Sequence, residues 1–181
     1  RASTPRRLSP APPARARRVA EELIGPEMFS GWGIRTVAST ECRYNPLSYH
    51  NGSIWPHDNG LIAAGFSRYR FVDLVSSPFT GLFDASVTMD GRLPELFCGF
   101  HRRGGEGPTR YPVACAPQAW ASGVVFELIQ ACVPLSIDVD ARRWSVDGAT
   151  LPPFLMWLRI LNLDLPWGQV DLLVERHNAE I

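Results

Sequence analysis

The chain has 181 residues, of which 45% are hydrophobic, and its formal net charge at pH 7 is zero. This length and apolar content are enough for one domain with a core, and the balanced charge gives no reason to expect nucleic acid or an anionic membrane surface as a partner. All 18 basic residues are arginine, which excludes enzymes that depend on a Schiff-base lysine, a P-loop lysine or a kinase lysine.

The N-terminal segment, residues 1–14, is rich in proline and arginine and has almost no large apolar group. Such a composition cannot offset the entropy of ordering, so we expect a flexible lead-in. The segment also lacks the apolar stretch of a signal peptide, and no apolar run of the chain reaches the length of a membrane span. The sequence therefore predicts a cytoplasmic protein with no membrane partner.

Two short helices are expected in the first part of the fold. Apolar residues at helical spacing predict a helix over 16–24, which ends at Gly25. A second helix is predicted over 58–70, where Asp58 or Asn59 is suited to cap the first turn.

Two further helices follow. One is expected to begin at Ser77-Pro78 and to end at Gly91, because proline is favoured in a first helical turn and glycine just after the last. The other, over 117–133, is apolar nearly all round. That pattern is typical of a helix buried on most sides, so this helix needs neighbours.

The residue pattern changes from helix-like to strand-like after Pro134. Residues 154–165 and 168–176 read as strands, the second with alternating apolar residues, and Pro166-Trp167-Gly168 between them is typical of a turn. We therefore divide the chain into a lead-in (1–14), a helical portion (15–134) and a β tail (135–181) that contains a hairpin.

The four cysteines show no CxxC spacing, which is the usual signature of a metal or redox site. Free cysteine usually behaves as a small apolar side chain. We expect buried or inert thiols at Cys42, Cys98, Cys115 and Cys132.

The segment from Tyr44 to Gly60, YNPLSYHNGSIWPHDNG, is dense in aromatic rings and hydrogen-bonding side chains. His50, His57 and Asp58 are residue types that bind metals. Their spacing matches no known zinc frame, and a third ligand would have to come from His101 or Glu95. The sequence thus disfavours a metal site, and no cofactor is expected.

Two other catalytic patterns are also disfavoured. Ser53 lies in no G-x-S-x-G motif, so a Ser-His-Asp triad is not supported. The stretch RRGGEG, 102–107, lacks the lysine and the strand-to-helix context of a phosphate-binding loop, and a flexible loop is the simpler interpretation.

The composition of the segment Tyr44–Gly60 fits a carbohydrate site better than a metal site or a catalytic triad. Aromatic rings cover the apolar C–H faces of sugars, while Asn, His, Asp and Gln side chains bind hydroxyl groups, so Tyr49, Trp55, His57 and Asp58 are suited to line a sugar site. The alternative is a core-packing loop whose polar groups satisfy one another. Composition alone leaves both interpretations open.

Four motifs carry a resemblance to a known family. FSGWGIRTVAS, YNPLSYHNGSIWPHDNGLIAAGFSRY, GRLPELFCGF and PTRYPVACAPQAWASGVVFELIQAC together resemble the C-terminal part of bacterial amylo-alpha-1,6-glucosidase, or glycogen debranching, proteins. The resemblance runs from about Ala16 to Arg176. The spacing Tyr49-x-x-Gly52-x-x-Trp55 is more loosely similar to that of other alpha-glucosidases.

The resemblance implies a glycoside hydrolase that acts on alpha-glucosidic linkages of an alpha-glucan or oligosaccharide. The catalytic domain of such enzymes is an (alpha/alpha)6 toroid of twelve helices. The implied fold is therefore mainly α, a partial toroid with a short C-terminal β-hairpin, and the upstream part of the same protein is the expected partner.

The resemblance also implies site residues. Glu95, in RLPELFCGF, matches the glutamate expected to be the general base, whereas the general acid is expected to be an aspartate upstream of residue 1. Asp58 is the alternative carboxylate, although its place at a helix start suits a cap or a sugar ligand better. The implied substrate-binding residues are Tyr49, His50, Asn51, Trp55, His57, Asp58, Gln118 and Trp120; for Trp120, core packing is an equal alternative.

Two hypotheses remain open: a glycoside hydrolase completed by an upstream part, and a truncated, non-catalytic remnant or sugar-binding fragment. Under the first, the loop from Tyr49 to Asp58 and Glu95 should approach each other in space. The apolar helix over 117–133, left without the helices of a full toroid, should make the isolated chain prone to aggregate.

Overall fold

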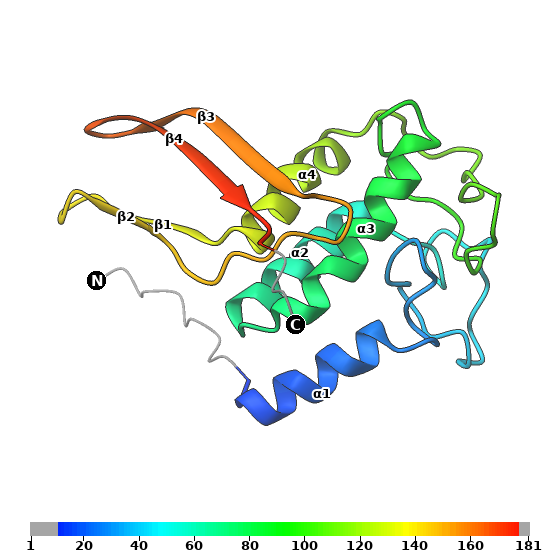
Figure 1. Ribbon diagram of the computed structural model, residues 1–181. Coiled ribbons are helices and arrows are strands. Elements are labelled where there is room, and N and C mark those ends of the chain that lie inside the picture. The colour runs from blue at the N-terminus through cyan, green and yellow to red at the C-terminus, as the bar shows by residue number, and fades with distance from the viewer. Residues whose placement is uncertain (1–10, 178–181) are drawn as a thin grey trace, which may run out of the picture.

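The computed structural model describes residues 11–177, and within them the chain forms four helices and two β-hairpins (Figure 1). The helices are α1 (Pro13–Ile24), α2 (Pro56–Arg68), α3 (Val72–Val87) and α4 (Ala119–Cys132), and the strands are β1 (Leu135–Asp138), β2 (Arg143–Val146), β3 (Trp157–Leu165) and β4 (Gly168–Glu175). Most of the predicted lead-in, residues 1–10, lies outside the described residues, and Pro13 and Ala14 already belong to α1.

The predicted fold class is wrong. A mainly α, partial (α/α)6 toroid requires helices that follow one another in antiparallel pairs. Instead, long stretches without helix, residues 25–55 and 88–118, separate the helices, and the chain after α4 continues into two antiparallel hairpins. The described residues form a small mixed α/β domain.

Helix α2 lies close to its predicted position but begins at Pro56, two residues early, with Trp55 as the N-cap residue and no side-chain cap hydrogen bond. The prediction that Asp58 or Asn59 caps this helix is therefore wrong. Proline at the first position lacks an N–H and needs no cap partner. Asp58 lies in the first turn, where a carboxylate is favoured by the helix dipole, and Asn59 is fully buried.

Helix α3 begins at Val72, so the predicted start at Ser77-Pro78 is wrong, and Pro78 lies inside the helix. Asp73 supplies a carboxylate in the true first turn. Helix α4 confirms the helix predicted over 117–133, but the prediction that it is buried on most sides is wrong. It buries Val124 and Leu128 among others, but Phe126 remains 75% exposed, so its apolar surface is only partly covered.

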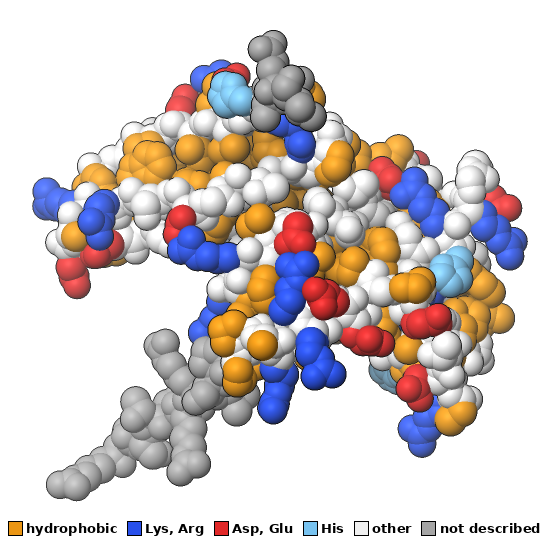
Figure 2. Space-filling view, turned by 60° about the horizontal axis from the view of Figure 1, so that its bottom comes forward, with side chains coloured by type: hydrophobic (Ala, Val, Ile, Leu, Met, Phe, Trp, Pro, Cys, Tyr) orange, Lys and Arg blue, Asp and Glu red, His pale blue; other side chains and the backbone are white. Residues whose placement is uncertain are grey.

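The hairpin of β3 and β4 confirms the predicted C-terminal strands, with an irregularity between Ile160 and Leu163. There Asn162 adopts a positive φ of 51°, and its backbone N–H donates to the Asp171 carboxylate at 2.9 Å. The hairpin of β1 and β2 was not predicted. Figure 2 shows hydrophobic side chains gathered along the arm of the molecule that the hairpins form.

Helix α2 packs against both α3 and α4 and forms the middle of the core (Figure 1). Gly60 permits the close approach to α4, since a Cβ atom added there would lie 2.3 Å from Val124 Cγ2. The stretches 25–55 and 88–118 lie together at one end of these helices, and the hairpins lie at the other. We call these two regions the loop end (25–55 and 88–118) and the hairpin end (134–177).

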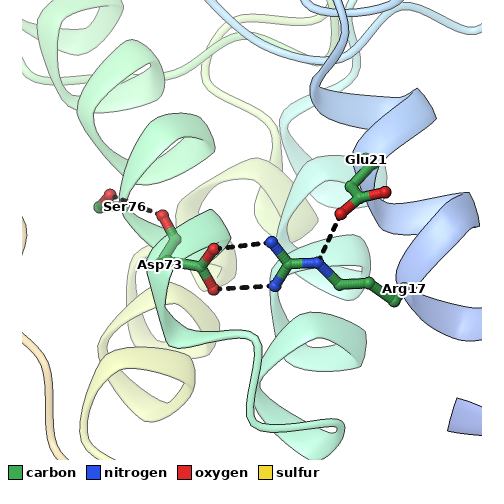
Figure 3. Close-up of polar contacts among 4 residues, drawn as sticks. All are labelled: Arg17, Glu21, Asp73 and Ser76. Carbon is green, nitrogen blue, oxygen red and sulfur yellow. Dashed lines mark hydrogen bonds and ion pairs between the residues drawn. The ribbon is translucent and has the colours of Figure 1, made fainter. Parts of the chain in front are cut away.

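Helix α1 is attached to α3 by an ion pair. The Arg17 guanidinium donates to both oxygens of Asp73, at 3.3 and 3.1 Å, and its Nε donates to Glu21 at 2.8 Å (Figure 3). The alanines at 16 and 20 face the core. Among residues 11–177, none of the helices has the length and apolar content needed to cross a bilayer.

Backbone bridges order the loop end in place of regular strands. Arg35 pairs with Ile54, Ile54 with Phe97, and Phe97 with Arg110. A Cβ atom added at Gly99 would fall 1.7 Å from the carbonyl oxygen of Gly52, so only glycine fits there. The loop end is therefore closely packed although it contains no named helix or strand.

Candidate functional site

The segment Tyr44–Gly60 is held in the loop end by its own hydrogen bonds. Thr36 Oγ1 donates to the carbonyl of His50 at 2.7 Å and accepts from the Gly52 N–H at 2.9 Å. Ser53 Oγ donates to the carbonyl of Tyr49 at 2.6 Å and accepts from Trp55 Nε1 at 3.0 Å. Ser53 is thus a buried structural group, which fixes the positions of Tyr49 and Trp55.

Glu95 lies directly beside this segment. Its Oε1 accepts a hydrogen bond from the Tyr49 hydroxyl at 2.5 Å, and its Oε2 accepts from the Cys115 N–H at 3.2 Å. The Glu95 N–H donates to the Cys115 carbonyl at 2.8 Å, which anchors the backbone on the same side. The predicted approach of Glu95 to the Tyr49–Asp58 loop is confirmed.

The hydrogen bond between Tyr49 and Glu95 changes the acidity of both groups. Donation from the Tyr49 hydroxyl, and then from the Cys115 N–H, lowers the pKa of Glu95 below its ordinary value. The same bond, together with partial burial, raises the pKa of Tyr49 to about 12. At neutral pH the pair is therefore a carboxylate and a protonated phenol.

The Tyr49 ring and five others linked to it by ring contacts form what we call the aromatic cluster: Tyr49, His50, Trp55, His57, Tyr111 and Trp120. The Tyr49 ring is 4.7 Å from His50, 5.0 Å from Trp55 and 5.6 Å from Tyr111, in edge-on arrangements. Trp55 is 6.4 Å from Trp120, and Trp120 stacks on His57 at 5.4 Å with an angle of 12° between the rings.

The structure brings five of the predicted substrate-binding residues into this cluster. Asn51 is exposed and lies at a separate hollow on the side of α1, with Arg15 and Arg18. Gln118 is the N-cap residue of α4, and its side-chain oxygen accepts from the Ala119 N–H at 2.9 Å. Asp58 is exposed in the first turn of α2, next in sequence to His57.

Two residues that belong to the site escaped prediction. Tyr111 contributes a ring, and Cys115 binds the Glu95 carboxylate through its backbone N–H. Both lie in PTRYPVACAPQAW, one of the motifs that carry the family resemblance, and the tyrosine in it was the available signal. The Cys115 contact could not be predicted in this way, because a backbone N–H group is present in almost every residue and gives no pattern in the sequence.

The prediction of buried thiols holds for two of the four cysteines. Cys98 and Cys132 are buried, and burial raises the pKa of both thiols, that of Cys132 to about 12. Cys42 and Cys115 are exposed. Cys42 lies in a turn of the loop end, and Cys115 follows another turn.

The geometry also bears on a metal site and on the stretch 102–107. Within residues 11–177, no group of three or more His, Cys, Asp and Glu side chains could hold a metal ion. In the stretch 102–107, the Arg102 side chain is engaged, since it donates to Asp84 at 2.6 Å and lies over the Trp32 ring at 4.4 Å.

Comparison with known proteins adds no family. No protein-family model matches the chain, and no curated protein matches it.

Proposed function

We propose that the chain binds an alpha-glucosidic carbohydrate on the aromatic cluster and that Glu95 is the carboxylate that activates water in its hydrolysis. The observation that carries the proposal is the contact of Glu95 with Tyr49, which holds an ionised carboxylate beside a set of ring faces. The resemblance of the surrounding motifs to amylo-alpha-1,6-glucosidases supports the same substrate class.

The accessible rings suit the C–H faces of a glucose unit. Trp120 is 45% exposed, and His50 is exposed, whereas Trp55 and Tyr49 are half-buried between them. Aromatic rings of this kind provide the apolar part of a ligand site, and the imidazole and hydroxyl groups at their edges provide directed hydrogen bonds. Because apolar ring faces and hydrogen-bonding groups lie side by side in the cluster, it suits a polyol better than a purely apolar ligand.

The lowered pKa of Glu95 supports its proposed role as base rather than acid. A general acid in glycoside hydrolysis must carry a proton at working pH, which requires a raised pKa, whereas a base must be ionised. Hydrogen bonds from Tyr49 and Cys115 keep Glu95 ionised and fix its orientation. Each carboxylate oxygen retains a further lone pair for a water molecule.

Hydrolysis also needs a proton donor on the other face of the sugar. Glu95 is the one carboxylate hydrogen-bonded to the aromatic cluster within residues 11–177. The proposal therefore takes the general acid from outside the cluster, from another part of the protein. The same observation favours the second candidate function, a sugar-binding fragment without catalytic activity.

Calorimetric titration of the full chain with maltose, isomaltose and a short branched dextrin tests the binding step. Trp120→Ala should weaken binding by about tenfold, because a stacked aromatic face contributes roughly 1 kcal/mol beyond its buried area. Trp157→Ala is the matched control, since Trp157 is 61% exposed at the hairpin end. Equal loss in both variants, or no binding by the unaltered chain, would contradict the proposal.

Hydrolysis assays separate the two candidate functions. The chain alone should release no glucose from these sugars. In a preparation that also supplies the proton donor, Glu95→Gln should lower kcat by roughly 10² to 10⁴ with little change in KM. Near-normal turnover of that variant would exclude Glu95 as the base, and Asp58→Asn would be tested next.

A further inference from the structure

A hollow of about 530 Å³ lies next to the aromatic cluster, between the end of α3 and the segment that leads to α4. Its walls come from two stretches, 89–94 and 110–117, and include Arg92, Pro94, Arg110 and Tyr111. This volume falls in the range of small-molecule sites. The hollow is therefore large enough for one substituted sugar unit or a part of it.

The hollow carries an excess of positive charge. Arg92 and Arg110 both line it, and neither guanidinium forms an ion pair or a side-chain hydrogen bond within residues 11–177. Both residues are exposed, so their guanidinium groups are available to an anionic ligand. Among the described residues, Asp90 is the single carboxylate that lines the same hollow.

The hollow and the aromatic cluster share a wall. Tyr111 lines the hollow, and its ring is 5.6 Å from the Tyr49 ring, whose hydroxyl binds Glu95. Pro94, which also lines the hollow, directly precedes Glu95 in the chain. One ligand can therefore contact the rings with its neutral part and the arginines with a charged part.

We propose that Arg92 and Arg110 bind the oxyanion of an anionic sugar, a phosphate ester or a uronate carboxylate, whose ring lies on the aromatic cluster. This inference rests on the proposed function, because it takes the cluster as a sugar site. Guanidinium groups present paired donors that match the geometry of phosphate and carboxylate oxygens.

Charge also sets the orientation of such a ligand. Glu95 is ionised and repels an oxyanion placed beside it, whereas the arginines attract one. The anionic group is thereby directed away from Glu95 and into the hollow, and the neutral ring is left next to the carboxylate. Asp90 opposes the attraction, so its removal should strengthen binding.

Titration of the full chain with glucose, glucose 6-phosphate, glucuronate and inorganic phosphate tests the inference. At least one charged sugar should bind about tenfold or more tightly than glucose, because charge-assisted hydrogen bonds to arginine add to the ring contacts. Whichever of the two charged sugars binds more tightly identifies the phosphate or the carboxylate as the natural group. The advantage should shrink as salt is added.

Substitutions in the hollow test which residues cause the tighter binding of the charged sugar. Arg92→Gln and Arg110→Gln should each reduce the advantage of the charged sugar and leave glucose binding unchanged, and Asp90→Asn should increase it. Arg103→Gln is the control, since Arg103 is exposed and lines a different hollow. A loss in the control equal to that in the other arginine variants would overturn the assignment.

The outcomes also separate this inference from the proposed function. If neutral sugars bind and charged sugars bind no more tightly, the inference is overturned and the proposed function stands. If inorganic phosphate binds as tightly as glucose 6-phosphate and glucose does not bind, the sugar ring contributes nothing, and both the inference and the proposed function are overturned.

Discussion

The loop end and the hairpin end of the molecule are ordered by different interactions. The loop end has no named helix or strand in 25–55 and 88–118, yet Arg35, Ser53 and Glu95 are buried there. The hairpin end has regular strands, yet Trp157 and Leu173 are more than half exposed. The irregular region is thus the more deeply buried of the two.

The difference shows where the geometry of the site comes from. In the hairpins, backbone ladders satisfy the polar groups, and most side chains face solvent. In the loop end, buried side chains form hydrogen bonds with backbone groups, and one of these side chains comes from the adjoining helix α2. Asn59 accepts from the Ile34 N–H at 2.7 Å and donates to the carbonyls of Ile34 and Trp55 at 3.1 and 2.9 Å. Such contacts fix individual residues, which a functional site requires.

The sharpest way to test this comparison is to remove Asn59. Asn59→Ala leaves the buried backbone groups of Ile34 without partners, and we expect a loss of about 3 kcal/mol or more in the free energy of unfolding. Urea denaturation measures it. Gln169→Ala at the hairpin end removes an exposed hydrogen bond to Asp164 and should change stability by less than about 0.5 kcal/mol. Equal losses in both variants would contradict the comparison.

The second test concerns how the stability of the protein depends on pH, beginning with acidic pH. Because the pKa of Glu95 is lowered in the folded state, its contribution to stability is present above the ordinary carboxyl pKa and is lost as pH falls through the folded value. Tyr49→Phe removes the largest cause of the lowering, so the Glu95 pKa should rise and acid unfolding should begin at a higher pH.

Carboxyl carbon NMR of Glu95 across the titration measures this shift directly. The unaltered protein offers an alkaline counterpart. The raised pKa of Tyr49, about 12, makes its contribution complete below the ordinary tyrosine pKa and lost as pH rises toward 12. An unchanged Glu95 pKa in Tyr49→Phe would show that the hydrogen bond is not formed in solution.

The smallest effect is expected for an ion pair that joins the hairpin end to the turn between α2 and α3. Arg70 and Asp147 form an ion pair at 2.5 Å, but their side chains are 76% and 64% exposed. Exposed pairs contribute little, so Arg70→Ala should lower the free energy of unfolding by less than about 1 kcal/mol, and less at high salt. A double-mutant cycle with Asp147→Ala measures the pair alone. A coupling as large as the Asn59 effect would reverse the contrast between the two ends.

Local patterns predicted several elements, because each rests on signals within a few residues. Apolar spacing located α4, and alternation around a proline-containing turn located β3 and β4. The start of α3 was missed because a proline inside a helix carries the same signal as one at its first turn. The β1–β2 hairpin was missed because its strands have only four residues each, too few for the alternation of apolar and polar residues to stand out.

The overall fold and part of the site depend on contacts that no local pattern contains. Sequence motifs suggested the meeting of Glu95 with Tyr49, but not the mutual arrangement of the helices, so the toroid was a wrong prediction. Asn59 was considered as a cap, whereas its side chain instead satisfies Ile34, far away in the chain. Pairings of this kind are determined by the tertiary structure.

The close contact of Gly52 with Gly99 has a consequence for the order of folding. This contact and the bridge from Ile54 to Phe97 join stretches far apart in the chain, whereas each helix forms from neighbouring residues. Distant pairings require the closure of long loops and therefore form more slowly than helices. Helical signal should recover early in refolding, and the Tyr49–Glu95 contact should appear only in the slowest phase.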